Sequence, residues 1–415
     1  MPTFLRDNAR WLLGGFLLTL FSGFGQTIFI GASGGELREA FGMSNGQWGN
    51  LYGLATLASA ATLPFIGKVM DVRPGWQVAM VVIPSLALAC VLMAFAQSVL
   101  VLGISLYLLR LLGQGMMSHI ALTETARWFA ASRGKAISIV VLGFQAQEAI
   151  FPLSFTLIVA SFGYRTGWLV AAASLILVAL PVITSLLRQP REPQGEAEFA
   201  APTGRDWTRA EVVRDPLFYA MLTGVLAPPF IGTTLFFHRD HLAELRGLAD
   251  WAMGAGIPLM AALTVGFALL TGRLVDRYGA VRLLPIAMLP LGLASLAVAG
   301  LDGIAGVFVF FGLFGISYGF ATTLFGSVWP EAYGVRHLGA IRSVTQSAMV
   351  FATALGPWIT GALIDRGVAL PAQFGVMALY CAVTGVLLIG ASRRLAERAG
   401  AERRSPRDDL TTERP

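Results

Sequence analysis

The sequence predicts an all-α membrane protein built from twelve transmembrane helices in two pseudo-symmetric six-helix bundles. Its 415 residues are 55% hydrophobic and 13% charged, whereas a soluble domain is about 25% charged. The mean hydropathy of +0.68 therefore indicates that most of the surface faces lipid. A short loop sequence also occurs twice, 205 residues apart, as GKVMDVRPGW at Gly67–Trp76 and GRLVDRYGAVR at Gly272–Arg282. A repeat at half the chain length indicates two similar halves.

Twelve apolar runs follow one another along the chain, and each is long enough to cross a bilayer, which takes about 20 residues. Six runs lie in the first half of the chain and six in the second. The expected spans are about 10–31, 48–66, 76–97, 100–124, 135–160, 166–187, 217–237, 251–271, 281–300, 303–326, 338–362 and 370–391.

The composition divides the chain into four parts. We expect a first bundle at residues 1–187 and a second bundle at 216–392. The segment between them, 188–215, mixes prolines with charged residues and cannot lie in hydrocarbon, so it is expected to be a cytoplasmic linker. The charged tail at 393–415 is expected to be disordered.

Local signals refine the region around the linker. Residues Asp206–Arg214 are compatible with a short surface helix, and Asp215 followed by Pro216 is typical of an N-cap with proline at the first helical position. Inside span seven, Pro228 and Pro229 remove helix hydrogen bonds. We therefore expect span seven to break or kink there, as helices that line a substrate path often do.

Positive charge is distributed unevenly between the two sides of the predicted membrane. The termini and the loops after spans two, four, six, eight and ten carry 24 of the 30 Lys and Arg residues, and the opposite loops carry five. Because positive residues stay cytoplasmic, we expect a multi-pass protein of the cytoplasmic (inner) membrane with both termini in the cytoplasm. The net charge of +6 then follows from topology, so we expect no nucleic-acid partner, and we expect a monomer.

Motifs for ATP hydrolysis and for zinc-dependent hydrolysis are absent from the sequence. It contains no Walker GxxxxGK[ST] and no HExxH, so we expect neither an enzyme nor an ATP-driven pump. The two cysteines, Cys90 and Cys381, lie singly inside apolar runs without metal-ligand spacing. We therefore expect no metal and no cofactor, and either transport driven by a gradient or facilitated transport.

The two repeated loops share the pattern Gly-x-x-x-Asp followed by basic residues and glycine. The matching residues are Gly67, Asp71 and Arg73 in the first copy and Gly272, Asp276, Arg277, Gly279 and Arg282 in the second. With its six-plus-six spans and charged central loop, the chain resembles the major facilitator superfamily over nearly its whole length. The resemblance implies that each loop aspartate interacts with a neighbouring helix N-terminus and with basic residues, which stabilises an outward-open state; a carboxylate is favourable at such a terminus. In the first copy Val72 replaces the usual arginine, which makes Arg73 the candidate basic partner of Asp71.

Two further loops carry a narrower resemblance. The segment Arg127-Trp128-Phe129, followed by Arg133-Gly134-Lys135-Ala136, is similar to a loop of monocarboxylate-porter-like members of that family. The segment Trp329-Pro330-Glu331, with the downstream Gly339, resembles the equivalent loop before span eleven.

Two ionisable side chains are expected near the middle of the membrane. Arg110 lies about ten residues into span four, and Glu148 lies about thirteen residues into span five. A charge at the bilayer centre costs about 2.5–3.5 kcal/mol on insertion scales, so it faces a cavity or a partner. Two interpretations stay open. Either Arg110 and Glu148 form a structural ion pair, or Arg110 binds an anionic substrate while Glu148 pairs with it in the empty state or carries a proton.

Other polar residues at similar depth are candidates for lining the same cavity, with hydrogen bonding between helices as the alternative role for each. They are Gln26, Gln145, Tyr318, Thr322 and Gln346.

These features predict a secondary transporter that moves a small solute by rocking two bundles about a central site. Its expected partners are a small-molecule substrate, protons and the lipid bilayer. Arg110 favours an organic anion such as a monocarboxylate, with proton symport as the coupling. Efflux of an amphipathic compound is the alternative within transport, and a membrane sensor or scaffold is the alternative from another class.

Overall fold

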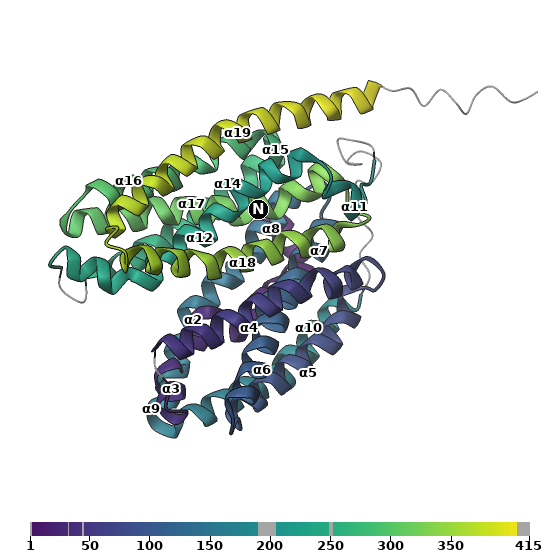
Figure 1. Ribbon diagram of the computed structural model, residues 1–415. Helices are drawn as coiled ribbons and strands as arrows, with labels where there is room; N and C mark the ends of the chain where they lie inside the picture. Colours follow the sequence, from purple (N-terminus) through teal and green to yellow (C-terminus); the bar gives the residue numbers. More distant parts are fainter. Residues whose placement is uncertain (1, 32, 44, 190–204, 249–251, 405–415) are drawn as a thin grey trace, which may run out of the picture.

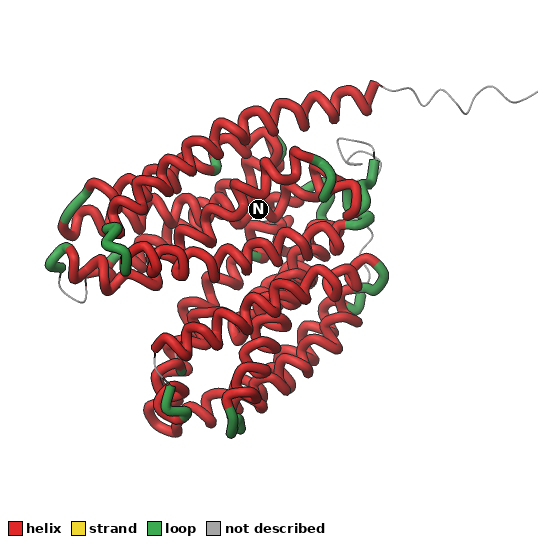
Figure 2. Tube along the Cα trace, in the orientation of Figure 1, coloured by secondary structure: helices red, strands yellow, loops and turns green. Residues whose placement is uncertain are grey.

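The computed structural model describes residues 2–31, 33–43, 45–189, 205–248 and 252–404, and the regular structure in these segments is helical (Figure 1, Figure 2). The helices of the first half are α1 (Pro2–Phe21), η1 (Ser22–Gly25), α2 (Thr27–Gly31), α3 (Gly34–Ala40), α4 (Asn45–Ile66), η2 (Gly67–Asp71), α5 (Gly75–Ala94), α6 (Val99–Leu109), η3 (Arg110–Met117), α7 (Ser118–Trp128), α8 (Arg133–Val140), α9 (Leu142–Ser174), η4 (Leu175–Ala179) and α10 (Leu180–Leu187). Those of the second half are α11 (Arg209–Val212), α12 (Pro216–Leu245), α13 (Ala252–Ala255), α14 (Ile257–Tyr278), α15 (Ala280–Leu283), η5 (Leu284–Ile286), α16 (Met288–Gly300), α17 (Gly303–Tyr333), α18 (Leu338–Ile364) and α19 (Leu370–Arg404).

The prediction of twelve membrane spans is confirmed. Eleven segments of the described chain are long and apolar enough to cross a membrane, and their ends lie within about eight residues of the expected ones. The remaining expected span, 135–160, is also helical, as α8 and the first part of α9, but it carries the polar Gln145, Gln147 and Glu148. Gly163 then interrupts the helical backbone of α9 with φ 79° and ψ 161°, and span six follows.

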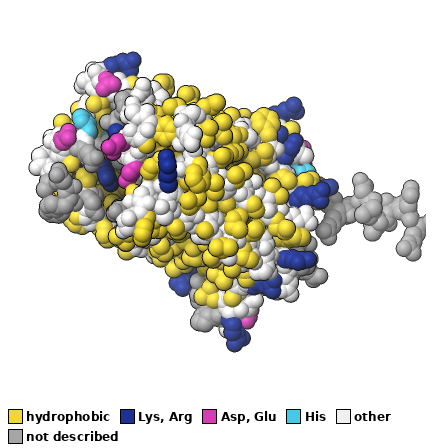
Figure 3. All heavy atoms as spheres, turned by 90° about the horizontal axis from the view of Figure 1, so that it is seen from below, with side chains coloured by type: hydrophobic (Ala, Val, Ile, Leu, Met, Phe, Trp, Pro, Cys, Tyr) yellow, Lys and Arg dark blue, Asp and Glu magenta, His cyan; other side chains and the backbone are white. Residues whose placement is uncertain are grey.

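The outer surface is apolar over the length of the helices. Large side chains such as Leu177 (73% exposed), Val376 (67%) and Leu379 (65%) point outward. In lipid a helix satisfies its own backbone hydrogen bonds, so its outward face needs no polar group. On the face drawn in Figure 3, most Lys and Arg side chains lie toward the end with the grey tail, and hydrophobic side chains cover the broad area beside them.

The helices form two bundles, α1–α10 and α12–α19, which converge near α7 and α11 and diverge toward the opposite end (Figure 1). The bundles meet through α4 against α18 and through α8 against α14. We call the converging end the basic end, because it carries Arg127 and Arg336 close to Asp71.

An aromatic cluster holds span one against spans five and six in the first bundle. Phe24 stacks on Phe151 with ring centroids 4.6 Å apart. Phe29 meets Phe155 edge-on at 4.6 Å and Trp168 at 5.1 Å. Aromatic pairs in these geometries stabilise a fold beyond the area that they bury, so the cluster fixes the stretch of span one described below.

The linker end and the C-terminal tail are more ordered than the sequence suggested. The short helix expected within 206–214 is present as α11, which begins at a capping box between Thr208 and Glu211. The N-cap prediction is confirmed, because the Asp215 carboxylate accepts the Leu217 N–H at 3.1 Å. Residues 190–204 lie outside the described part of the chain.

The expectation of a disordered tail from residue 393 is wrong as far as residue 404, because α19 continues to Arg404. Leu395 is buried at 3% exposure. Three residues on, the Arg398 guanidinium binds the buried Asp215 carboxylate through Nη1 at 2.7 Å and Nη2 at 3.2 Å. Apolar burial and this paired charge together extend the helix beyond the membrane span. Residues 405–415 lie outside the described part.

Candidate functional site

Span one is broken near its C-terminal end. After α1, the chain forms the single 3₁₀ turn η1, then Gln26 adopts an extended conformation with φ −83° and ψ 153° before α2 begins. Glycine makes the break possible. A Cβ on Gly25 would clash with the carbonyl oxygen of Leu109 and would lie 2.7 Å from the Cα of Gly113. The expected break at Pro228 and Pro229 is wrong, because α12 continues through both prolines and its non-helical backbone lies at His238.

Span four changes its helical pitch opposite this break. The segment η3 is a π-helix that begins at Arg110, and π-helical turns within α-helices occur frequently at functional sites. The Arg110 side chain is 1% exposed. Its Nη1 donates to the Gly25 carbonyl oxygen and to Thr27 Oγ1, each at 3.2 Å. The guanidinium also lies over the Tyr52 ring, 5.4 Å from its centroid, and the Tyr52 hydroxyl donates to Thr27 Oγ1 at 2.8 Å.

Two nitrogen atoms of Arg110 have no hydrogen-bond partner among the described residues. Both Nε and Nη2 are buried and unsatisfied. Their N–H bonds form one edge of the planar guanidinium, and such an edge binds both oxygens of a carboxylate in parallel. A buried donor without an acceptor costs about 1–3 kcal/mol, and more when it is charged. The break in span one therefore orients Arg110 through Nη1 and leaves a complete carboxylate-binding edge vacant.

The structure brings Glu148 to a different place. No ion pair between Arg110 and Glu148 occurs among the described residues, since Arg110 bonds to span one instead. The carboxyl of Glu148 interacts electrostatically with Tyr318 of the second bundle. Its neighbour Gln147 points the other way, toward Gly23 of span one. The structural ion pair proposed from depth alone is therefore absent in this conformation.

The other candidate lining residues are half-buried, and Gln26 lies between Gly25 and Thr27, the two residues that Arg110 bonds. Thr322 donates to the Gly319 carbonyl within its own helix at 3.2 Å, and Tyr318 stacks on Phe314 at 5.9 Å. Within the described chain, no hydrogen bond involves the side chains of Gln26, Gln145 or Gln346.

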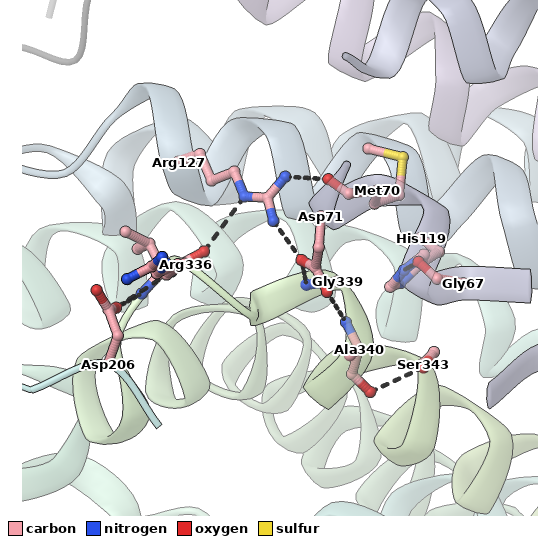
Figure 4. Close-up of polar contacts among 11 residues, drawn as sticks. Gly67, Met70, Asp71, His119, Arg127, Asp206, Arg336, Gly339, Ala340 and Ser343 are labelled. Atoms are coloured by element: carbon pink, nitrogen blue, oxygen red, sulfur yellow. Dashed lines mark hydrogen bonds and ion pairs between the residues drawn. The ribbon is translucent and has the colours of Figure 1, made fainter. Parts of the chain in front are cut away.

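A first junction between the bundles is built on Asp71 at the basic end (Figure 4). Its carboxylate accepts the backbone N–H groups of Gly339 and Ala340, both at 2.8 Å, in the first turn of α18. Arg127 Nη2 lies 2.5 Å from the same carboxylate. The expectation that Arg73 is the basic partner of Asp71 is wrong, because Arg73 is exposed and Arg127 of span four takes that position.

A second junction repeats the first with the halves exchanged. The Asp276 carboxylate accepts the N–H groups of Gly134 at 2.7 Å and Lys135 at 3.1 Å, in the first turn of α8. The Lys135 ammonium lies 3.8 Å away. Each loop aspartate therefore crosses to the N-terminus of a helix in the other bundle, where partial positive charge favours a carboxylate. We call these two junctions the Asp71 latch and the Asp276 latch.

The remaining motif residues serve the latches less directly. A Cβ on Gly67 would lie 2.5 Å from Ser343 Cβ, and one on Gly272 would lie 2.5 Å from Ser138 Oγ, so both glycines allow the bundles to touch. Gly279 has φ 84° and ψ 151°, a conformation that side chains disfavour. Arg277 and Arg282 are exposed and form no described bond to Asp276.

The role of two glutamates was not predicted from the sequence; each of them binds the N-terminus of the helix that follows a repeated loop. Glu331 accepts the Ala280 N–H at 2.5 Å and the Val281 N–H at 3.2 Å at the start of α15. In the first bundle, Glu124 meets the backbone of Gly75 at the start of α5. The two glutamates are 207 residues apart, close to the offset of the repeated loops, and that match in spacing is the signal that could have revealed them.

Comparison with known proteins agrees with this arrangement. Among curated relatives, the oxalate:formate antiporter of Oxalobacter formigenes is 25% identical over 264 residues, which are 61% of this chain and 61% of the relative. The aspyridones efflux protein of Emericella nidulans is 24% identical over 323 residues, 76% of this chain and 62% of the relative. The aligned regions thus span about three fifths of the length of each curated relative.

Solved structures share the fold at low sequence identity. The human organic anion transporter MFSD10 has a TM-score of 0.69 at 17% identity, covering 92% of this chain and 99% of its own. The transporter FucP in the outward conformation has a TM-score of 0.67 at 12% identity, covering 92% of this chain and 97% of its own. Residues 15–357 and 267–412 match the family model described as Major Facilitator Superfamily, so this chain is a multi-pass membrane transporter belonging to that family.

Proposed function

We propose that this transporter moves a small organic anion across the membrane by alternating access, and that Arg110 binds its carboxylate. The observation that carries the proposal is the vacant Nε–Nη2 edge of a guanidinium that is 1% exposed. A charged donor held without an acceptor in a low-dielectric site is costly, and an anion that occupies it removes that cost. The similarity to an oxalate:formate antiporter supports the same substrate class.

The neighbours of Arg110 favour a small substrate. Thr27 of span one accepts a hydrogen bond from the guanidinium at 3.2 Å, and Tyr52 of span two donates to Thr27 at 2.8 Å while its ring lies against the guanidinium. A monocarboxylate, or a short dicarboxylate, needs no more than one such fork and a few neutral donors.

The conformation supports a path that is closed at the basic end. Both latches, together with the hydrogen bond from Ser347 Oγ to the Ala60 carbonyl, join the bundles there. We infer that the basic end faces the cytoplasm of a cell bounded by its inner membrane, since Lys and Arg residues stay on that side. The structure then corresponds to an outward-facing state of a monomer, with both termini cytoplasmic.

Coupling to protons is part of the proposal. Symport with a proton would neutralise one negative charge of the substrate, and exchange of one anion for another would avoid charge build-up in a different way. Glu148 sits opposite Tyr318 at the contact between bundles, where a carboxyl that changes charge would alter how the bundles meet.

Counterflow in proteoliposomes tests the substrate assignment. Purified protein is reconstituted into vesicles preloaded with unlabelled formate, acetate, lactate or oxalate, and uptake of the labelled anion is measured with and without a pH gradient. We expect saturable counterflow for at least one carboxylate. Arg110→Gln should abolish it, and Arg110→Lys should weaken it at least tenfold, because an ammonium keeps the charge but lacks the planar fork.

Arg273→Gln is the matched control, because Arg273 is an exposed arginine on the lipid-spanning helix α14. Counterflow that survives Arg110→Gln unchanged would refute the carboxylate site. Silence across the panel in folded protein would instead favour the second candidate, efflux of an amphipathic compound, which the similarity to the aspyridones efflux protein supports. That candidate is tested by following export of a hydrophobic dye from the same vesicles.

A further inference from the structure

The two latches are related by the internal symmetry of the chain, but the side-chain packing beside them differs between the two halves. Asp71 and Asp276 bind matching helix N-termini, and Ser343 and Ser138 occupy matching places beside Gly67 and Gly272. Near the first latch, His119 of span four faces α18. The matching place in the second half is Gly326, which packs against the Ile137 side chain, 2.8 Å from where a Cβ would lie. One of two equivalent contacts thus contains a titratable ring, and the other is apolar.

His119 is enclosed at this contact. It is 2% exposed, and its Nε2 lies 3.0 Å from the carbonyl oxygen of Gly67 at the end of span two (Figure 4). Its Nδ1 is buried and has no partner among the described residues. The ring also interacts with the backbone of Gly339 in the other bundle. His119 therefore lies between the two halves at the point where the Asp71 latch closes.

The charged groups around His119 are cations. Arg342 of α18 is 6% exposed, and its Nη1 donates to the Gly326 carbonyl at 2.8 Å. Arg127 approaches from the helix of His119 itself, and both guanidinium groups act electrostatically on the ring. The acidic group of η2, Asp71, already binds Arg127 and two backbone N–H groups. No carboxylate among the described residues is left to compensate a charge on His119.

A protonated ring would be a third buried cation at one closed contact. Burying an unpaired charge is expensive, and like charges at close range repel strongly in a low-dielectric interior. The closed contact therefore accepts neutral His119 and excludes its imidazolium form. When the bundles separate at the basic end, the ring meets water, where an imidazole titrates near pH 6.5, roughly its ordinary value.

We propose that His119 is a proton-binding site of this transporter, neutral while the basic end is closed and protonated when that end is open to solution. The inference rests on the proposed alternating-access function and makes the opening of the basic end depend on pH. Proton binding at the basic end stabilises the open state, and closing the bundles returns the proton to the solution on that same side. The chemical ligand is the proton itself, so no covalent step is involved.

Distance measurements between spin labels test the proposal without any substrate. Cys90 and Cys381 are replaced by Ala, and labels are attached at Lys68→Cys and Arg273→Cys, two exposed positions in opposite bundles. Distance distributions are recorded in nanodiscs between pH 8 and pH 5. We expect a longer distance to appear on acidification, with the open-to-closed ratio rising toward tenfold per pH unit below about pH 6.5, as one linked proton requires.

Two substitutions and one control decide the result. His119→Gln should make the distance distribution independent of pH. Arg342→Gln, which removes a facing cation, should weaken the pH response and shift the opening transition to lower pH, because the closed contact then tolerates the imidazolium better. His337→Gln, a histidine immediately before α18, should leave the transition in place. An unchanged pH response in His119→Gln, or no pH response in the parent protein, would overturn the proposal. Loss of carboxylate counterflow with an intact pH response would reject only the substrate assignment.

Discussion

Replacing Asp71 by Asn should open the basic end of the transporter. The substitution keeps the size of the side chain but removes the charge that binds Arg127 at 2.5 Å and the two N–H groups of α18 at 2.8 Å. A single amide oxygen cannot serve both N–H groups and the guanidinium. Hydrogen bonds to charged groups contribute about 1.5–3 kcal/mol each, and the helix terminus adds about 0.3–1 kcal/mol. We expect a net loss of about 3 kcal/mol.

That loss corresponds to a change of roughly 150-fold in the ratio of closed to open molecules, at about 1.4 kcal/mol per factor of ten. The assay is the labelling rate of Ser347→Cys in the protein without Cys90 and Cys381. Ser347 donates to the Ala60 carbonyl across the two bundles, so a thiol there reacts with a maleimide only when the bundles part. While the open state is rare, the labelling rate rises in proportion to its population.

The matched variant is Asp276→Asn, whose effect should be smaller. Lys135 lies 3.8 Å from that carboxylate and its side chain is 41% exposed, so the ion pair contributes about 0–1 kcal/mol. We expect Asp276→Asn to destabilise the closed state by about 2 kcal/mol, which raises the labelling rate roughly 30-fold. Asp7→Asn, an exposed acid that pairs with Arg6, should leave the rate unchanged. If Asp71→Asn is labelled at the same rate as the parent protein, the Asp71 latch is refuted. A larger increase in the labelling rate for Asp276→Asn than for Asp71→Asn would refute the reasoning about Arg127.

Two further predictions concern stability. Burial alone would raise the pKa of the Asp215 carboxyl, but bonds from Arg398 and Leu217 outweigh it and hold that pKa below its usual value. Because the folded pKa is lowered, this group stabilises the fold above the unfolded pKa of about 3.9. Its contribution should disappear as pH falls through the folded pKa. Asp215→Asn should lower Tm in detergent at pH 7, and this difference in Tm should shrink as pH falls below the unfolded pKa; an equal Tm at pH 7 would contradict the paired charge. Gly279→Ala should destabilise by about 1–3 kcal/mol, because φ is 84° and its Cβ would lie 2.7 Å from Glu331 Oε1. Gly266→Ala on the same helix meets no atom within 4 Å and should be neutral or stabilising, so equal Tm shifts for both would refute the backbone argument.

The spans could be predicted because hydropathy and length act locally along the chain. Apolar runs of about 20 residues form helices in lipid whatever they pack against, and the repeated loop revealed the two halves. The tail was harder, since charge after residue 392 suggested disorder. Its order depends on Asp215, which is 183 residues away in sequence and binds Arg398. No local sequence pattern predicts the ion pair between Asp215 and Arg398.

At the candidate site, the position of a residue along its helix does not predict which side chain it contacts. The sequence predicts similar depth for Arg110 and Glu148, but successive residues on a helix are rotated by about 100°. Gln147 therefore faces Gly23 in span one, while Glu148 interacts with Tyr318 in the other bundle. The partner of Asp71 was missed for a related reason, because Arg127 comes from span four and the sequence places only Arg73 close by.

The free energy that the two latches contribute determines which ligands can open the basic end. Moving a two-state equilibrium from 1:99 to 99:1 takes a difference of about 5.5 kcal/mol, and the Asp71 and Asp276 latches together contribute about 5 kcal/mol if their effects add, as separate sites usually do. In the proposed mechanism an anion on Arg110 and a proton on His119 act on the same closure, and each pH unit of proton binding is worth about 1.36 kcal/mol. Latches built from four backbone N–H groups are therefore strong enough to keep the basic end shut. They remain weak enough for the ligands to reverse, which is the condition for coupling the ligands to the motion.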